Sequence, residues 1–207
     1  MADVTLHGSY LSGPTYKVGL MLKMAGIAYN YRHVDLVTGE QHGAPFLALN
    51  RFGQVPVLTH GDLALAQSNV ILSYLAQTFG RLSPPGTLRW KAEEWLAWEA
   101  DKLFTGLART RFFKKFIPTD PLIAKHYMKN ANEALGVLEK QLAGLEFLVG
   151  PSLTYADIAL YATVWMAKDG QVDLAPYANV TAWQRRVEAQ PGFGGPRDVL
   201  YKQDHTA

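Results

Sequence analysis

The chain contains no cysteine, and this absence removes several classes of protein at once. A disulfide scaffold, a thiolate metal site, an iron–sulfur centre and a catalytic cysteine all require the missing side chain. Any thiol chemistry in this protein therefore depends on a thiol that arrives with a ligand.

Long apolar runs and an excess of charge of one sign are also missing. No run of about 18 apolar residues could span a bilayer, and the start MADVTLHGSYL lacks the basic and apolar regions of a signal peptide. Twenty Lys and Arg residues against eighteen Asp and Glu residues give a formal charge of +2, too balanced for a dedicated nucleic-acid binder. We expect a cytoplasmic protein with neither a nucleic-acid nor a membrane partner.

The histidines give no metal-binding pattern. All six are scattered along the chain and form neither HxxxH nor HExxH, so no metal site is predicted. A hydrophobic share of 48% is normal for a globular protein and excludes wholesale disorder. The length of 207 residues allows one large domain or two small ones.

The first eighty residues alternate between the periodicities of strands and helices. Short β-prone runs alternate with segments in which apolar residues recur every three or four positions. The predicted strands cover residues 4–6, 29–35, 55–59 and 63–66, and the predicted helices cover residues 14–25, 41–49 and 68–80. The resulting order, β-α-β-α-β-β-α, predicts a compact α/β unit.

The pattern changes after Gly80. Residues 81–87 include Ser83-Pro84-Pro85-Gly86, a composition typical of a linker. Every strong pattern beyond residue 87 is helical, which predicts an all-helical second domain over residues 88–207. The predicted helices are 88–116, 121–142, 154–167 and 180–188. Thr154 and Asp157 have the spacing of a capping box, so we expect Asp157 to stabilise a helix and not to take part in catalysis.

Three features of the first eighty residues could bind a ligand. In Val55-Pro56-Val57, a cis peptide bond at Pro56 would turn the Val55 backbone outward to pair with a peptide-like ligand; the alternative is a strand that begins at Pro56. Ser68, after Gln67, is a good N-cap, and its helix N-terminus suits a carboxylate. Ser12, before Gly13-Pro14, could donate to an anion such as a thiolate, or act as an ordinary cap.

These features together resemble the cytosolic glutathione S-transferases, in particular serine-type or nu-like bacterial members. The matching stretches are SYLSGPTYKVGLML, FLALNRFGQVPVL, LALAQSNVILSYLA, FLVGPSLTYADIALYA and WMAKDGQVDLAPYANVTAWQRRV. The resemblance covers the whole chain. It implies a thioredoxin-like βαβαββα N-terminal domain (1–80), a linker (81–87), an all-helical C-terminal domain (88–207) and a homodimer.

The resemblance also implies a role for each matching residue. Ser12 would be the catalytic hydroxyl that stabilises the glutathione thiolate, with Tyr10 as a weaker candidate. Glutathione, the co-substrate, would be held by Gln54 at its glycyl end, by Val55 beside the cis-proline Pro56, and by Gln67 and Ser68 at its γ-glutamyl end. The acceptor pocket would be formed by Tyr10, Leu11, Phe104, Ala108, Arg111 and Phe112.

Several departures leave the reaction open. Many members have Glu-Ser where this chain has Gln67-Ser68, and Asn-Pro where Asn50-Arg51 stands. We expect transfer of glutathione to a small hydrophobic electrophile, a detoxification reaction. The alternatives are glutathione-dependent reduction of disulfides or peroxides, and a non-catalytic binding or adaptor protein. The basic and aromatic segment 109–116 is typical of a nucleic-acid or membrane contact, but at helical spacing it favours one apolar face with basic residues on the others.

Overall fold

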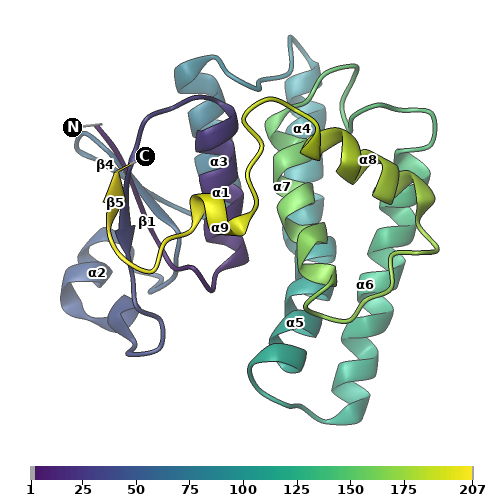
Figure 1. Cartoon of the computed structure of the whole chain (residues 1–207), viewed down its shortest axis with the longest axis horizontal. Helices are drawn as coiled ribbons and strands as arrows, with labels where there is room; N and C mark the ends of the chain where they lie inside the picture. The colour runs from purple at the N-terminus through teal and green to yellow at the C-terminus, as the bar shows by residue number, and fades with distance from the viewer. Residues whose placement is uncertain (1–2, 207) are drawn as a thin grey trace. The chain divides into compact units, whose positions relative to one another are not determined.

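The computed structural model describes residues 3–206, which form two compact units (Figure 1). The first unit consists of the chain up to Arg81 together with the C-terminal segment from Pro191, and the second unit covers Leu82–Gln190. Among the described residues, no helix is long and apolar enough to cross a membrane.

The first unit contains a mixed sheet and the helices that pack on it. Along the chain come β1 (Val4–Gly8), α1 (Gly13–Met24), β2 (Asn30–His33), a 3₁₀ turn (Glu40–His42), α2 (Ala44–Leu49), β3 (Val57–His60), β4 (Leu63–Ala66) and α3 (Ser68–Phe79). The sheet order is β4-β3-β1-β2-β5, with β1 parallel to β2 and the other pairs antiparallel. This confirms the predicted thioredoxin-like order.

Helices α1 and α3 pack together on one side of this sheet (Figure 1). Helix α1 is buried on every side from Thr15 to Leu22, whereas α3 buries one stripe, Ile71, Leu72, Leu75 and Ala76. The core side chains Leu6, Val18, Leu22, Leu58 and Leu72 are fully or almost fully buried. The sheet is thus a rigid base for the loops at its edge.

The C-terminal segment differs from the prediction, which assigned residues 191–207 to the helical domain. It returns to the first unit, where α9 (Pro196–Val199) packs on α1 and β5 (His205–Thr206) pairs with β2. Val199 is fully buried and packs against Gly19 of α1, where a Cβ on the glycine would lie 3.2 Å from the Val199 Cβ. Arg32 and Asp204 form an ion pair of 2.7 Å beside β5. A two-residue strand carries no periodicity, which is why the sequence pattern missed it.

The second unit is helical, as predicted. It contains α4 (Leu88–Trp98), α5 (Phe104–Lys115), α6 (Pro121–Gln141), α7 (Tyr155–Val164), a 3₁₀ turn (Trp165–Ala167) and α8 (Ala178–Glu188). A π-helical turn at Glu99–Leu103 joins α4 to α5, so the predicted helix 88–116 is present but interrupted. Buried Glu99 accepts a hydrogen bond from the Thr163 hydroxyl of α7 at this turn.

The capping box at the start of α7 is confirmed. Asp157 Oδ2 accepts the Thr154 N–H and hydroxyl, each at 2.9 Å. Its Oδ1 accepts the Leu148 N–H at 2.9 Å and the Trp183 indole N–H at 3.0 Å. Burial raises the pKa of Asp157, while these four hydrogen bonds oppose the shift. The carboxylate therefore joins a loop, α7 and α8 at one buried point.

Candidate functional site

The strand register brings the three candidate loops of the first unit to one edge of the sheet. His7 of β1 lies opposite Val57 of β3, and Val57 lies opposite Ala66 of β4. The loop that carries Ser12 leaves β1 just beyond this row, Val55-Pro56 enters β3 at it, and Gln67-Ser68 leaves β4 at it. Residues far apart in sequence therefore meet at one edge.

Ser12 is the N-cap of α1, as predicted. Its backbone is extended, and its Oγ accepts the Thr15 N–H at 3.2 Å. A hydroxyl oxygen that accepts this bond keeps its own proton for donation. Ser12 is half-buried and lies beside the positive end of the α1 dipole. Its hydroxyl is thus oriented by the helix and can donate to an anion.

A second serine in the same loop, Ser9, escaped the sequence prediction. It is 1% exposed, and its hydroxyl has no hydrogen-bond partner among residues 3–206. The loop is tightly packed here, because a Cβ on Gly8 would lie 2.1 Å from the Thr15 methyl group. Ser9 is therefore enclosed, and Ser12 is the more accessible hydroxyl.

The Val55–Pro56 peptide bond is cis, as the first alternative for this tripeptide requires, and β3 begins at Val57 and not at Pro56. The Val55 side chain packs against the buried cluster of Val34, Phe46 and Val57. Within the described part of the chain, no backbone hydrogen bond engages Val55. With the side chain directed into the core, the Val55 backbone is available to an extended ligand.

Asn50 orders the loop before Val55. Its side-chain amide donates to the Gln54 carbonyl at 2.7 Å, and its side-chain oxygen accepts the Phe52 N–H at 3.0 Å. Asn50 is buried, whereas Gln54 and Arg51 are exposed. The loop thus presents one amide and one guanidinium to solvent beside Val55.

The β4–α3 junction differs in one detail from the prediction. Ser68 is the first residue of α3 and not its N-cap, and Gln67 occupies the cap position with φ 71°. Positive φ is rare for a residue with a side chain and occurs often at ligand-binding sites. No side-chain hydrogen bond caps this end of α3. Its first N–H groups lack the side-chain acceptor that Thr15 has in α1.

Lys17 adds a cation to this junction and was not predicted. It is 2% exposed within α1, yet its Nζ lies 2.8 Å from Asn69 Oδ1, in the first turn of α3. The available signal was a lysine directly before Val18, inside the apolar stripe of α1. A buried ammonium bonded next to Ser68 makes this end of α3 more electropositive.

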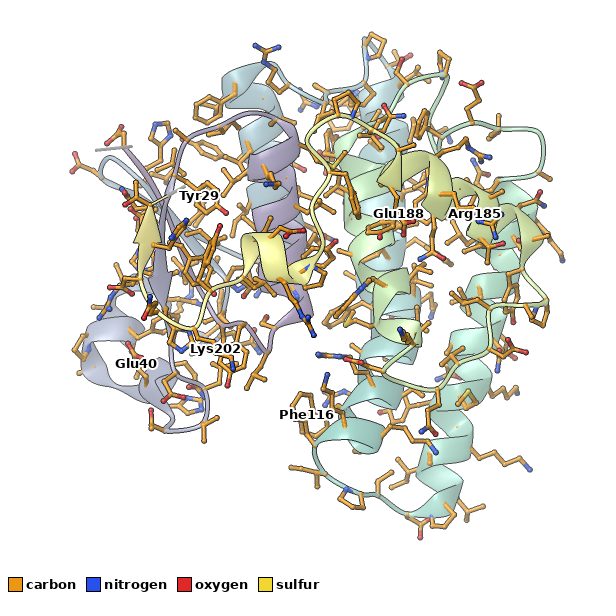
Figure 2. All side chains as sticks on the ribbon, viewed as in Figure 1. Tyr29, Glu40, Phe116, Arg185, Glu188 and Lys202 are labelled. Carbon is orange, nitrogen blue, oxygen red and sulfur yellow. The ribbon has the colours of Figure 1, made fainter. Side chains whose placement is uncertain are left out.

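Tyr10 and Leu11 lie in the loop between β1 and α1. Tyr10 is exposed, and its ring stacks on His33, the last residue of β2, at a centroid distance of 5.7 Å. The Lys202 ammonium of the C-terminal segment lies 5.3 Å from the Tyr10 ring centroid (Figure 2). Leu11 is half-buried. The aromatic side chain is therefore held from two sides.

The other four predicted pocket residues belong to α5 of the helical unit. Phe104 and Ala108 are half-buried and Phe112 is exposed, at the spacing of one helix stripe. Arg111 is 8% exposed, and its Nε donates to Asp169 Oδ2 at 3.0 Å. The Lys115 ammonium lies 2.6 Å from the same oxygen. Arg111 therefore links α5 to the segment after α7.

The ion pairs with Arg111 and Lys115 shift the pKa of Asp169. Burial alone would raise its pKa, but the hydrogen bonds and charges of Lys115 and Arg111 lower it below the ordinary value. Within residues 3–206, no group of three or more His, Cys, Asp or Glu side chains could hold a metal ion.

Comparison with known proteins identifies the class that this fold and site define. Residues 3–77 match the family model of the glutathione S-transferase N-terminal domain, and residues 107–193 match that of the glutathione S-transferase C-terminal domain. A solved glutathione S-transferase from Pseudomonas fluorescens is 34% identical with a TM-score of 0.89, covering 94% of this chain and 99% of that one. The chain belongs to the cytosolic glutathione S-transferase family and is a glutathione transferase.

Two further relatives describe what such proteins bind and do. A glutathione transferase family member from Pseudomonas fluorescens, solved with two glutathione molecules bound, is 25% identical with a TM-score of 0.83, covering 91% of this chain and 89% of that one. The disulfide-bond oxidoreductase YfcG of Escherichia coli is 30% identical over 188 residues, covering 86% of this chain and 87% of that one. Family members thus bind glutathione and differ in their reactions.

Proposed function

We propose that the protein transfers glutathione to a small hydrophobic electrophile, with the Ser12 hydroxyl stabilising the thiolate. The observation that carries the proposal is the geometry of Ser12, whose Oγ accepts the Thr15 N–H and keeps its own proton to donate. Because the chain has no cysteine, the sulfur nucleophile is that of glutathione.

Glutathione binding is assigned to the edge of the first unit. The Val55 backbone, beside cis-Pro56, pairs with the cysteinyl unit, and Gln54 contacts the glycyl end. Gln67 and Ser68 hold the γ-glutamyl end, where the helix N-terminus attracts the carboxylate. Lys17 is a positioning residue that acts through Asn69 on this carboxylate. Its charge strengthens a site in which Gln67 supplies no charge of its own.

The chemistry requires the thiol to ionise near neutral pH. The reference pKa of a cysteine thiol is about 8.5, and each unit of lowering corresponds to about 1.36 kcal/mol. A hydrogen bond to an anion and the end of a helix dipole together supply about one to two units. The thiolate then attacks the electrophilic carbon, and the leaving group departs with its electron pair. The residues proposed to contact the acceptor are Tyr10 and Leu11 in the first unit and Phe104, Ala108 and Phe112 in the helical unit, where Arg111 holds α5 to the segment after α7.

Calorimetric titration with glutathione tests the binding half of the proposal. Heat of binding that is lost in a variant with Ser68→Ala and Gln67→Ala supports it, whereas no binding to the wild-type protein favours a non-catalytic adaptor. Turnover of a chloronitroaromatic acceptor, measured in parallel, tests the transfer half. A protein that binds glutathione but never conjugates it would contradict that half.

Reduction of disulfides is the second candidate, supported by the likeness to YfcG. Two glutathione thiols would lose two electrons and form glutathione disulfide, while the substrate S–S bond is reduced to two thiols. No protein cysteine is needed. Turnover of hydroxyethyl disulfide faster than turnover of the chloronitroaromatic acceptor would favour this reaction over conjugation.

We further propose a cytoplasmic homodimer. Support comes from the family to which the chain belongs, since its members are typically homodimers. Light scattering at micromolar concentration should give twice the chain mass, and a mass of a single chain would contradict the proposal.

A further inference from the structure

The turn that joins α5 to α6 exposes apolar side chains. The buried side of α5 consists of Gly106, Leu107, Thr110 and Arg111. Phe112 and Phe116 are exposed, and Phe116 stands at the end of α5 (Figure 2). Two of the three phenylalanines of segment 109–116 are therefore at the surface, while Arg111, paired with Asp169, lies on the buried side.

Exposed aliphatic residues continue through the turn into α6. Ile117 is 56% exposed and Leu122 is 78% exposed, and Phe116 and Ile123 are exposed as well. We call these four residues the α5–α6 tip. Single exposed apolar residues are ordinary on a protein surface, but a cluster of four at one turn marks an interaction site.

Positive charge is concentrated around the α5–α6 tip. Residues 109–129 hold six of the twenty Lys and Arg residues and one of the eighteen Asp and Glu residues. This segment has a formal charge of +5, and the rest of the chain has a charge of −3. The near-neutral net charge of the whole chain, on which the prediction of no membrane contact depended, conceals this separation of positive from negative charge along the sequence.

Part of this charge is neutralised and part is available. Lys115 and Arg111 pair with Asp169, and Lys129 lies 3.6 Å from Glu133. Arg109, Lys114 and Lys125 are exposed, and no carboxylate of residues 3–206 pairs with them. These three cations lie on the two helices that flank the α5–α6 tip, and Asp120 is the one acid of residues 109–129.

We propose that the α5–α6 tip docks on the surface of an anionic lipid bilayer. Aliphatic side chains at a turn can enter the boundary between head groups and acyl chains, while the flanking cations remain at the anionic head groups. Three of the four side chains of the tip, Ile117, Leu122 and Ile123, offer neither a hydrogen-bond donor nor a ring to stack on bases, which favours a bilayer over a nucleic acid. Docking of this kind brings the enzyme to the phase in which hydrophobic electrophiles concentrate.

Co-sedimentation of the full chain with vesicles tests the proposal. Vesicles of phosphatidylcholine with one third phosphatidylserine should bind at least about tenfold more tightly than phosphatidylcholine alone, because each available cation contributes roughly fivefold. Binding should fall steeply as the salt rises from about 0.05 M to about 0.5 M. Equal binding to both vesicles, or to neither, would overturn the proposal.

Matched variants locate the contact. Leu122→Asp should weaken binding to anionic vesicles by about tenfold or more, since it places a charge where an aliphatic side chain enters the lipid. Val37→Asp is the control, because Val37 is 77% exposed but lies in the other unit. Equal loss in the two variants would refute the location.

Two further measurements distinguish entry into the bilayer from attraction to any polyanion. With Ile117→Trp, brominated lipids should quench the added fluorescence, and unchanged emission would place the tip outside the bilayer. Tighter binding to polyglutamate or duplex DNA than to anionic vesicles would make the patch a site for another polyanion. Circular dichroism and glutathione turnover of Leu122→Asp should match the wild-type protein.

Discussion

Replacing Ser12 by alanine should change both the stability of α1 and the ionisation of bound glutathione, and the two effects can be separated. The Oγ of Ser12 caps the helix by accepting the Thr15 N–H at 3.2 Å. Loss of this cap should cost about 0.5–2 kcal/mol of stability. Loss of a hydroxyl that donates to an anion should cost the thiolate about 1.5–3 kcal/mol.

The second effect corresponds to a rise of about one to two units in the pKa of the bound thiol. At a pH below the thiol pKa in the wild-type protein, turnover should fall about tenfold to hundredfold, because only the thiolate attacks the acceptor. The affinity for glutathione should change little, since Val55, Gln67 and Ser68 remain. The assay is the pH dependence of kcat/KM with a chloronitroaromatic acceptor, together with the ultraviolet absorbance of the bound thiolate.

Two companion variants distinguish the cap from the donor. Ser12→Thr keeps the cap and the hydroxyl, and should stay close to the wild-type profile. Ser12→Asp keeps the cap but replaces the donor by a negative charge, so it should be stable and should raise the thiol pKa further. If Ser12→Ala left the pH profile unchanged, or if Ser12→Asp behaved as wild type, the role of the hydroxyl would be refuted.

Three other perturbations follow from the structure. Lys17→Met should weaken glutathione binding about three- to tenfold by calorimetry. Binding of the dipeptide Cys-Gly should not change, because that ligand lacks the γ-glutamyl carboxylate. Lys23→Met, on the exposed side of α1, is the control, and an equal effect of that variant would contradict the role of Lys17 in binding the carboxylate. Asp157→Ala should lower the free energy of unfolding in urea by about 3–5 kcal/mol, since buried donors lose their acceptor. Asp198→Ala, at the exposed capping position of α9, should lower it by less than about 1 kcal/mol. Similar losses in the two variants would contradict the importance of burial at Asp157. Burial, and secondarily Arg32, lowers the pKa of His7 below 6.5, so the unfolded chain takes up the proton at a higher pH than the folded one. The free energy of unfolding should therefore fall as the pH drops below 6.5, and the fall should be smaller in His7→Gln. Identical pH dependence of stability in the two proteins would contradict this contribution of His7.

The architecture could be predicted from the sequence because each element carries its own periodicity. The strands and helices of the first unit alternate between periods of two and 3.6, and the linker composition marks where the helical segment begins. The capping box of Asp157 and the possible N-cap of Ser12 could also be predicted from the sequence, because their hydrogen bonds join residues three positions apart. Local signals of this kind need no knowledge of the tertiary structure.

What escaped prediction depends on contacts between distant residues. Nothing in a two-residue segment predicts that His205 pairs with Tyr31. The π-helical turn at Glu99 shifts the helix register by less than the pattern can resolve. The role of Lys17 depends on Asn69, 52 positions away, and the burial of Arg111 on α5 goes with its pairing to Asp169, 58 positions away. In each case tertiary packing decided what the local pattern left open.

The central claim is that this site ionises the glutathione thiol through Ser12, and proton release on binding tests it most directly. Calorimetric titrations at neutral pH in two buffers of different ionisation enthalpy give the number of protons released. Glutathione should release about a quarter to three quarters of a proton at about pH 7, as a thiol pKa lowered by about one to two units requires; S-methylglutathione should release none, and the Ser12→Ala variant much less with glutathione. No release with glutathione, or the same release from wild type and Ser12→Ala, would contradict the account.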